Sequence, residues 1–127
     1  MNATMPSVQS DAALNERRLS ERDEVMVARL VAGDERAFDE LVTKYHPSMV
    51  RLARGFVRNH DVAQEVTQET WVAILTGISR FEGRSSLKNW MFRILTNRAK
   101  TRGTREGRMT PMSALGAEAG ESAVNPD

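Results

Sequence analysis

The segment from residue 80 to residue 108 concentrates positive charge in a chain that is otherwise close to neutral. It holds nine basic and two acidic residues, a balance of +7, whereas residues 1–79 and residues 109–127 each sum to −3. Clustered Lys and Arg side chains attract phosphates, so this segment predicts a polyanionic partner such as a nucleic acid. The alternative interpretation is a solvated helix surface with no partner.

Within this segment, one stripe of a predicted helix has the side chains for nucleic-acid contact. At about 100° per residue, Asn89, Arg93, Thr96 and Lys100 fall within about 60° of one another. The two cations suit phosphates, and the Asn and Thr side chains can hydrogen-bond to bases or sugars. The opposite side of the helix carries its apolar residues, which are Leu87, Trp90, Met91, Ile94 and Leu95.

A second candidate surface lies on the predicted helix over residues 62–78. Its core stripe comprises Val62, Val66, Thr70 and Ala73. Another side of the same helix is polar in its first half and apolar in its second, and consists of Gln64, Glu65, Gln68, Val72 and Leu75. A mixed face of this kind favours either a docking surface for another protein or a second core contact inside the bundle.

Residues for covalent or metal chemistry are scarce. The chain has no cysteine and only two histidines, His46 and His60, which excludes disulfides, thiolate zinc sites and cysteine nucleophiles and leaves no multi-histidine metal site. Asn59, His60 and Asp61 are interpreted as a helix break with Asp61 as the cap, and His46 before Pro47 is interpreted likewise as a cap. We therefore expect no enzyme, no metal and no cofactor.

The elements that must position these residues are predicted to be helices. With 127 residues, 40% of them hydrophobic, the chain suits a single domain; it has no apolar run long enough to span a membrane and no signal peptide, so a cytoplasmic location is expected. We expect a flexible tail over residues 1–20, a helical domain over residues 21–108 and a flexible acidic tail over residues 109–127.

Helix start and stop signals divide this domain. A first helix is predicted to end at Gly33, and Asp34 is predicted to cap the next helix. Pro47 is predicted to mark a kink or the start of a third helix. Helices are further predicted over residues 62–78 and 87–102, the second capped by Ser85 or Ser86 after a loop over residues 80–84 that contains Gly83. No segment alternates at the period of a strand, so the sequence predicts an all-α bundle of four to five helices.

Three segments, in this order and spacing, resemble region 2 of the extracytoplasmic-function sigma factors in the sigma-70 family of bacterial RNA polymerase. They are AGDERAFDEL at residues 32–41, DVAQEVTQETW at residues 61–71 and RFEGRSSLKNWMFRILTNRA at residues 80–99. The resemblance covers about residues 24–108. Members of this family carry a second helical domain, region 4, and no segment after Arg108 resembles it.

The resemblance implies a small helical domain that docks on the clamp helices of the polymerase β′ subunit. It also implies recognition and melting of the promoter −10 element, with a base flipped from the non-template strand. The polymerase-binding residues implied are Asp61, Gln64, Glu65, Gln68, Glu69 and Val72. The DNA-binding residues implied are Arg80, Phe81, Arg84, Ser85, Ser86, Lys88, Asn89, Arg93, Thr96, Asn97, Lys100 and Arg102. Many family members are held inactive by an anti-sigma factor, and the sequence identifies no such partner.

Two other functions remain open at this stage. A small basic helical module could coat DNA or RNA without any polymerase, but such a module has no use for the mixed face of residues 62–78. A nuclease is disfavoured because the basic segment lacks the clustered carboxylates that hold catalytic metals.

Overall fold

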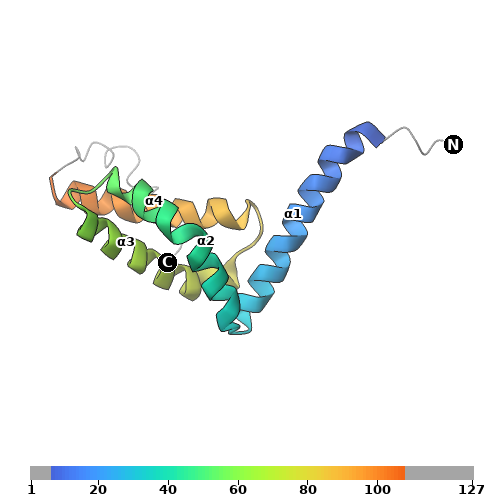
Figure 1. Ribbon diagram of the computed structural model, residues 1–127, viewed down its shortest axis with the longest axis horizontal. Coiled ribbons are helices and arrows are strands. Elements are labelled where there is room, and N and C mark those ends of the chain that lie inside the picture. The colour runs from blue at the N-terminus through green and yellow to red at the C-terminus, as the bar shows by residue number, and fades with distance from the viewer. Residues whose placement is uncertain (1–6, 108–127) are drawn as a thin grey trace.

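The computed structural model describes the backbone of residues 7–107 and the side chains of residues 13, 14 and 20–107. These residues form the helices α1 (Ser7–Val31), α2 (Glu35–Arg54), α3 (His60–Gly77) and α4 (Leu87–Arg105), with a short 3₁₀ helix, η2 (Ile78–Arg80), after α3. No strand occurs within residues 7–107, which confirms the all-α prediction. Figure 1 shows α2, α3 and α4 packed together, while α1 runs outward from one end of this bundle.

The core lies between α2, α3 and α4, with α3 packed against both of the others. Its largest fully buried hydrophobic side chains are Met49, Ile74, Met91, Ile94 and Leu95. The apolar stripe predicted for the last helix therefore faces the core, although Trp90 is only half-buried and packs at its edge. Because α3 and α4 share this core, their outer faces are held in a fixed relation to each other.

α2 runs through Pro47 without ending, so the two helices predicted on either side of this proline are a single helix. A proline inside a helix removes one backbone hydrogen bond and costs about 3 kcal/mol. The cost is offset by packing, because buried residues precede and follow Pro47 on the same helix: Ala37, Leu41, Met49, Val50 and Ala53. Pro47 therefore does not end the helix, because the buried residues on both sides of it hold α2 together.

α1 extends further toward the N-terminus than the sequence pattern indicates. Residues 7–20 are helical, which differs from the flexible tail predicted for residues 1–20. This stretch has no apolar period, but it is rich in strong helix formers such as Ala, Leu, Glu and Arg, and helix propensity does not require an apolar face. Residues 1–6 and the predicted acidic tail over residues 109–127 lie outside the described residues.

The caps of the helices agree with the sequence at two positions of three. The Asp34 side chain caps α2, and the Ser86 Oγ accepts from the backbone N of Asn89 at 3.0 Å to cap α4. The cap of α3 is Asn59, whose Oδ1 accepts from the N of Val62 at 2.9 Å, and not Asp61, which lies in the first turn. Asn and Asp are nearly equal as caps, so composition alone does not choose between them.

α4 continues beyond the predicted end at residue 102 and includes Gly103, which is buried. The carboxylate of Glu106 just after the helix accepts a hydrogen bond from the backbone N of Arg58 at 3.0 Å. This contact ties the end of α4 to the segment between α2 and α3. The long-range contact and the burial of Gly103 together explain why this glycine does not end the helix.

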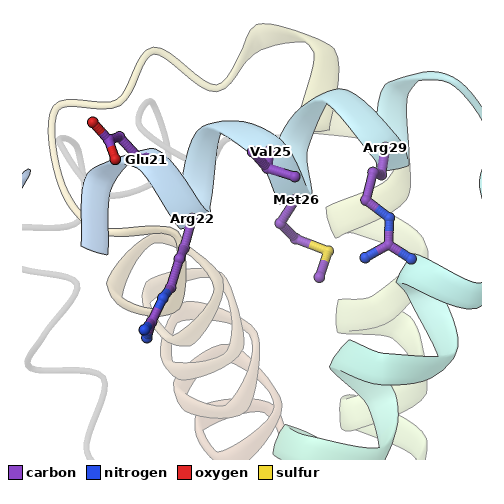
Figure 2. A pocket seen from close by; sticks show the side chains of 5 residues that line it. All are labelled: Glu21, Arg22, Val25, Met26 and Arg29. Carbon is purple, nitrogen blue, oxygen red and sulfur yellow. The ribbon is translucent and has the colours of Figure 1, made fainter. Parts of the chain in front are cut away.

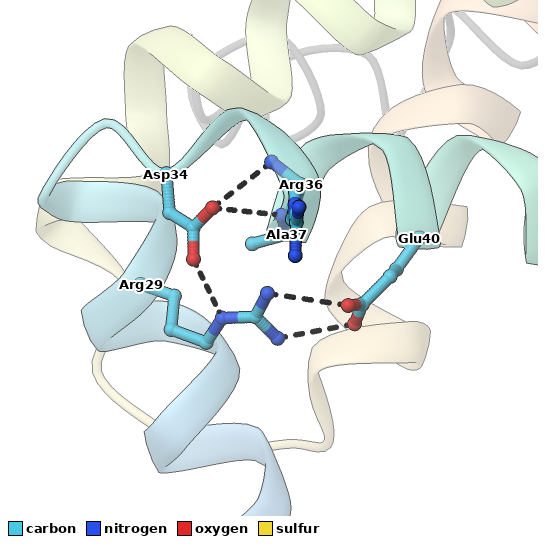
Figure 3. A network of polar contacts seen from close by, with 5 residues as sticks. All are labelled: Arg29, Asp34, Arg36, Ala37 and Glu40. Atoms are coloured by element: carbon cyan, nitrogen blue, oxygen red, sulfur yellow. Dashed lines mark hydrogen bonds and ion pairs between the residues drawn. The ribbon is translucent and has the colours of Figure 1, made fainter.

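A polar network joins α1 to α2 (Figure 3). Arg29 Nε lies 2.9 Å from Asp34 Oδ2, and its two terminal nitrogens lie 3.1 and 3.2 Å from the carboxylate oxygens of Glu40. The other oxygen of Asp34 accepts from the backbone N of Arg36 at 2.9 Å. The hydrogen bond from Arg29 is the main cause that lowers the pKa of Asp34, with a further contribution from the backbone donors.

Asp34→Ala is expected to lower the melting temperature by roughly 5 °C, because it removes both the α2 cap and the pairing with Arg29. Asp34→Asn keeps a capping oxygen and loses only the charge, so its loss should be smaller. Because the folded-state pKa of Asp34 is lowered, its contribution is complete above the ordinary aspartate pKa of about 3.9 and is lost as the pH falls through the lowered value. Thermal melts between about pH 7 and about pH 3 should therefore fall more steeply for the wild type than for Asp34→Asn, and parallel curves would contradict this account.

Candidate functional site

The mixed face of α3 lies on the surface of the bundle. All six residues predicted to bind polymerase are exposed: Asp61, Gln64, Glu65, Gln68, Glu69 and Val72. The apolar half is also open, with Val72 exposed to 64% and Leu75 to 44%. The core stripe of the same helix is buried from Val66 onward, and Val62 is half-buried. Within residues 7–107 this exposure excludes a second core contact and leaves a surface on which another molecule can dock.

Two polar contacts organise the first half of this face. The Nε2 atoms of Gln64 and His60 lie 3.0 Å apart, so His60 contacts a residue of the face. The guanidinium of Arg102, from α4, bonds to the carboxylate of Glu65, and its Nη1 lies 3.8 Å from Glu69 Oε2. Arg102 therefore belongs with the α3 face. The prediction that Arg102 binds DNA stays a prediction; nine positions, a net rotation of about 180°, separate it from Arg93 on α4.

The predicted nucleic-acid stripe lies on the outer side of α4. Asn89, Arg93 and Lys100 are exposed, and Thr96 is half-buried with its hydroxyl donating to the carbonyl of Phe92 at 2.8 Å. Two other predicted residues flank the stripe: Lys88, with its Nζ 5.9 Å from the ring centroid of Phe92, and the half-buried Asn97. Arg93 and Lys100 thus offer two cations to solvent on one line along the helix.

The loop between η2 and α4 precedes this stripe, and this loop and the last residue of η2 hold the remaining predicted DNA-binding residues. Phe81 is half-buried and packs edge-on against Trp90, with ring centroids 5.2 Å apart. Arg84 Nε lies 3.0 Å from Glu82 Oε1 in an exposed ion pair, and Gly83 takes a φ of +76°, which favours glycine. Arg80 is exposed, Ser85 is half-buried and donates to the carbonyl of Ser86, and Ser86 caps α4.

α1 and this loop form the two walls of a cavity that the sequence does not predict. The cavity has a volume of about 360 Å³ and is lined by Ser20, Asp23, Glu24, Val27, Ala28, Phe81, Glu82, Gly83 and Ser85. Asp23 Oδ2 also accepts a hydrogen bond from the backbone N of Leu87 at 2.9 Å. No local pattern reports a contact between residues 64 positions apart, so the sequence gives no signal for it.

A second hollow on α1 lies elsewhere and is more open (Figure 2). Its lining residues all come from α1 and are Glu21, Arg22, Val25, Met26 and Arg29. Glu21 and Arg22 point to different sides of the helix, and Val25 is 60% exposed. None of these five residues is among the predicted site residues, which makes them useful as controls.

His46 has a structural contact that the sequence does not indicate. It lies inside α2 and not at a cap, and its Nδ1 accepts from the indole Nε1 of Trp71 at 3.1 Å. Trp71 is buried and packs edge-on against Phe38, with ring centroids 5.5 Å apart. In the part of the chain that the structure describes, no three His, Cys, Asp or Glu side chains gather closely enough to hold a metal ion.

Comparison with known families gives a match to Sigma-70 region 2 over residues 41–109, which is more than half of the chain. The chain belongs to the sigma-70 region 2 family. This confirms the resemblance carried by the segments at residues 61–71 and 80–99, both of which lie inside the match. Sigma-70 region 2 is a binding module of transcription initiation, and the family is not an enzyme family.

Curated relatives place this region 2 chain beside extracytoplasmic-function sigma factors. It is 38% identical over 101 residues to the RNA polymerase sigma-H factor of Pseudomonas aeruginosa, covering 80% of this chain and 52% of that protein. It is 33% identical over 100 residues to the ECF RNA polymerase sigma-E factor of Haemophilus influenzae, and this match covers 79% of this chain and 52% of that protein. It is 34% identical over 95 residues to the ECF RNA polymerase sigma-E factor of Escherichia coli, and this match covers 75% of this chain and 49% of that protein. The chain spans about half the length of these relatives, and no solved structure matches it significantly.

The bundle of this region 2 chain carries its predicted surfaces on different helices. Gln64 and Gln68 on α3 and Asn89 and Arg93 on α4 are all exposed, so both surfaces are accessible in one molecule. Within residues 7–107, no helix combines the length and the apolar content that crossing a bilayer requires.

Proposed function

We propose that this chain serves as the region 2 module of an RNA polymerase sigma factor, with α3 as its polymerase surface and α4 with its preceding loop as its DNA surface. The polymerase surface comprises Asp61, Gln64, Glu65, Gln68, Glu69 and Val72, and it docks on the β′ clamp helices. The DNA surface binds the non-template strand of the −10 element. The observation that carries the proposal is that the six α3 residues and the α4 residues Asn89, Arg93 and Lys100 are exposed together on neighbouring helices of one core. Core polymerase works in the bacterial cytoplasm, so the chain acts there.

The polymerase surface has the composition that a helical partner requires. Gln64 and Gln68 supply amide donors and acceptors, while Val72 and Leu75 supply an apolar contact further along the same helix. Interfaces depend on a few apolar anchors surrounded by polar contacts that exclude water. The side chains of a clamp helix form a ridge, and the mixed face of α3 can pack along this ridge.

The DNA surface suits a strand that has already been opened. Unstacking a base costs a few kcal/mol, so a factor that favours the open state must bind the single strand better than the duplex. Arg93 and Lys100 supply affinity for phosphates, which does not depend on sequence. Sequence preference comes from unpaired bases held by the loop over residues 81–86, and no bond is made or broken in this process.

A pull-down with core RNA polymerase, followed by titration with single-stranded −10 oligonucleotides of varied sequence, tests the proposal. The full chain should retain core polymerase, and the complex should bind some oligonucleotides at least about tenfold more tightly than a scrambled strand. A chain that binds DNA without sequence preference and fails to retain polymerase would instead be a stand-alone basic module, and the proposal would be wrong.

Arg102→Ala is expected to weaken polymerase binding by roughly threefold to tenfold, because the carboxylates of Glu65 and Glu69 lose the cation that orders them. Arg105→Ala removes the same charge from the next turn of α4 and serves as the matched control. Affinity for single-stranded DNA should change equally in the two variants. A loss of DNA affinity specific to Arg102→Ala, with polymerase binding intact, would return this residue to the DNA surface.

A further inference from the structure

We propose that Asp23 of α1 is a positioning residue for the DNA-binding loop: its carboxylate holds the start of α4 against α1 and thereby sets the width of the cavity in which an unpaired base is held. This inference rests on the proposed function, since it concerns how that function's loop is shaped. It adds to the site a residue and a helix that lie outside the predicted DNA-binding set.

The contact that carries the proposal lies at the junction of loop and helix. Three backbone N–H groups in the first turn of α4 have identified acceptors. Asn89 N and Trp90 N use the hydroxyl and the carbonyl of Ser86, both at 3.0 Å, and these bonds are local. The N–H of Leu87 donates instead to Asp23 Oδ2 at 2.9 Å, across 64 residues of sequence. Asp23 therefore fixes where α4 begins relative to α1, which Ser86 alone cannot do.

The same residue lies in the wall of the cavity. Asp23 shares the lining with Val27 and Ala28 on the α1 side and with Phe81 and Gly83 on the loop side. The volume of about 360 Å³ is at the low end for small-molecule sites, which suits a single base better than a larger ligand. Because the loop ends at the amide that Asp23 holds, any shift of that amide changes the separation between the loop and α1.

Among the α1 side chains that the structure describes, Arg29 and Asp23 make polar contacts with other elements, and Asp23 is the one beside the cavity. Arg29, six residues later, joins the end of α1 to α2 through Asp34 and Glu40. Without a second polar contact, only the apolar packing of Met26 and Val27 would hold this part of α1 against the bundle. Apolar packing has little directional preference, so the bond from Leu87 N to Asp23 sets the position of α1 relative to the loop at the point where they face each other. The acidic wall formed by Asp23, Glu24 and Glu82 also disfavours phosphates inside the cavity, so a base and not the backbone is expected to enter.

Three variants of the full chain test the proposal. Asp23→Ala removes the acceptor, Asp23→Asn keeps an acceptor oxygen but removes the charge, and Glu21→Ala removes the same charge from a site on α1 away from the cavity. Far-UV circular dichroism checks that each variant is folded. If Asp23→Ala has lost helix content, Asp23→Glu replaces it, because that variant keeps the charge and displaces the carboxylate by one methylene.

The first readout is amide hydrogen exchange at Leu87 and over residues 81–86, which requires no DNA. Asp23→Ala should raise exchange at these positions by about tenfold or more, while Asp23→Asn and Glu21→Ala should remain within about threefold of the wild type. Unchanged exchange in folded Asp23→Ala would show that Asp23 does not position the loop, and the inference would be overturned.

The second readout is affinity for a series of single-stranded oligonucleotides in which each nucleotide in turn is made abasic. The wild type, Asp23→Asn and Glu21→Ala should each lose about tenfold or more at one position, and Asp23→Ala should lose less than about twofold there, with its affinity for the other strands little changed. A position-dependent loss that persists in Asp23→Ala overturns the inference and leaves the proposed function standing. A wild type with no position-dependent loss overturns base capture itself, whatever the exchange data show.

Discussion

Val72→Asp is expected to reduce the affinity for core RNA polymerase by about 100-fold or more. Val72 is 64% exposed and begins the apolar half of the mixed α3 face, which continues to Leu75. Burying an unpaired carboxylate against the apolar part of another protein costs several kcal/mol, because no partner there replaces its lost hydration. Binding measured by fluorescence anisotropy of the labelled chain against core polymerase gives the size of the loss.

The control for this variant lies on α1. Val25 is 60% exposed, nearly equal to Val72, and Val25→Asp introduces the same charge on a different face of the molecule. Both variants should melt within a few degrees of the wild type, because neither side chain belongs to the core. If Val72→Asp binds polymerase as tightly as Val25→Asp does, the α3 surface is not the polymerase surface.

The double variant Arg93→Ala, Lys100→Ala is expected to weaken binding to single-stranded DNA by roughly tenfold to 100-fold at low salt. Each phosphate contact to a single strand contributes about 0.7 to the slope of log affinity against log salt, so the slope should fall in magnitude by about 1.4. The loss should be nearly the same for every sequence, because phosphates carry no sequence information. Salt titrations with two unrelated oligonucleotides measure both quantities.

Two arginines on α2 serve as the matched control, because Arg36 and Arg51 are also exposed and Arg36→Ala, Arg51→Ala removes the same net charge. This control should leave the salt slope nearly unchanged, since its charges lie away from the proposed strand and are screened. Equal slopes for the two double variants would mean that binding follows net charge alone and that the α4 stripe makes no phosphate contacts.

Hydrophobic periodicity was sufficient to predict the helices and most of the core. Leu87, Met91, Ile94 and Leu95 recur at helical spacing, and all four are buried on α4. Local end signals were less reliable where packing competes with them. Pro47 lies inside α2 and Gly103 inside α4, because both segments are held by contacts on each side of the interrupting residue. A pattern of single residues reports propensity, and burial decides the outcome.

The residues of the candidate sites also divide into those that the sequence could place and those that it could not. Sequence spacing placed Asn89, Arg93 and Lys100 together on one exposed stripe, because one helix fixes their relation. The ion pairs of Arg102 with Glu65 and Glu69 could not be predicted in this way, since they depend on how α4 packs on α3. It also gave no indication of Asp23, whose partner lies 64 residues away. Contacts within an element are thus predictable, and contacts between elements require the fold.

Site-specific photo-crosslinking tests the central claim of two surfaces most directly. A photoreactive amino acid is placed at Gln68 or at Asn89, both exposed, and each chain is assembled with core polymerase and promoter DNA. Position 68 is expected to crosslink to the β′ subunit and position 89 to the non-template strand of the −10 element. Crosslinks from position 68 to DNA, or from position 89 to β′, would contradict the claim of two surfaces.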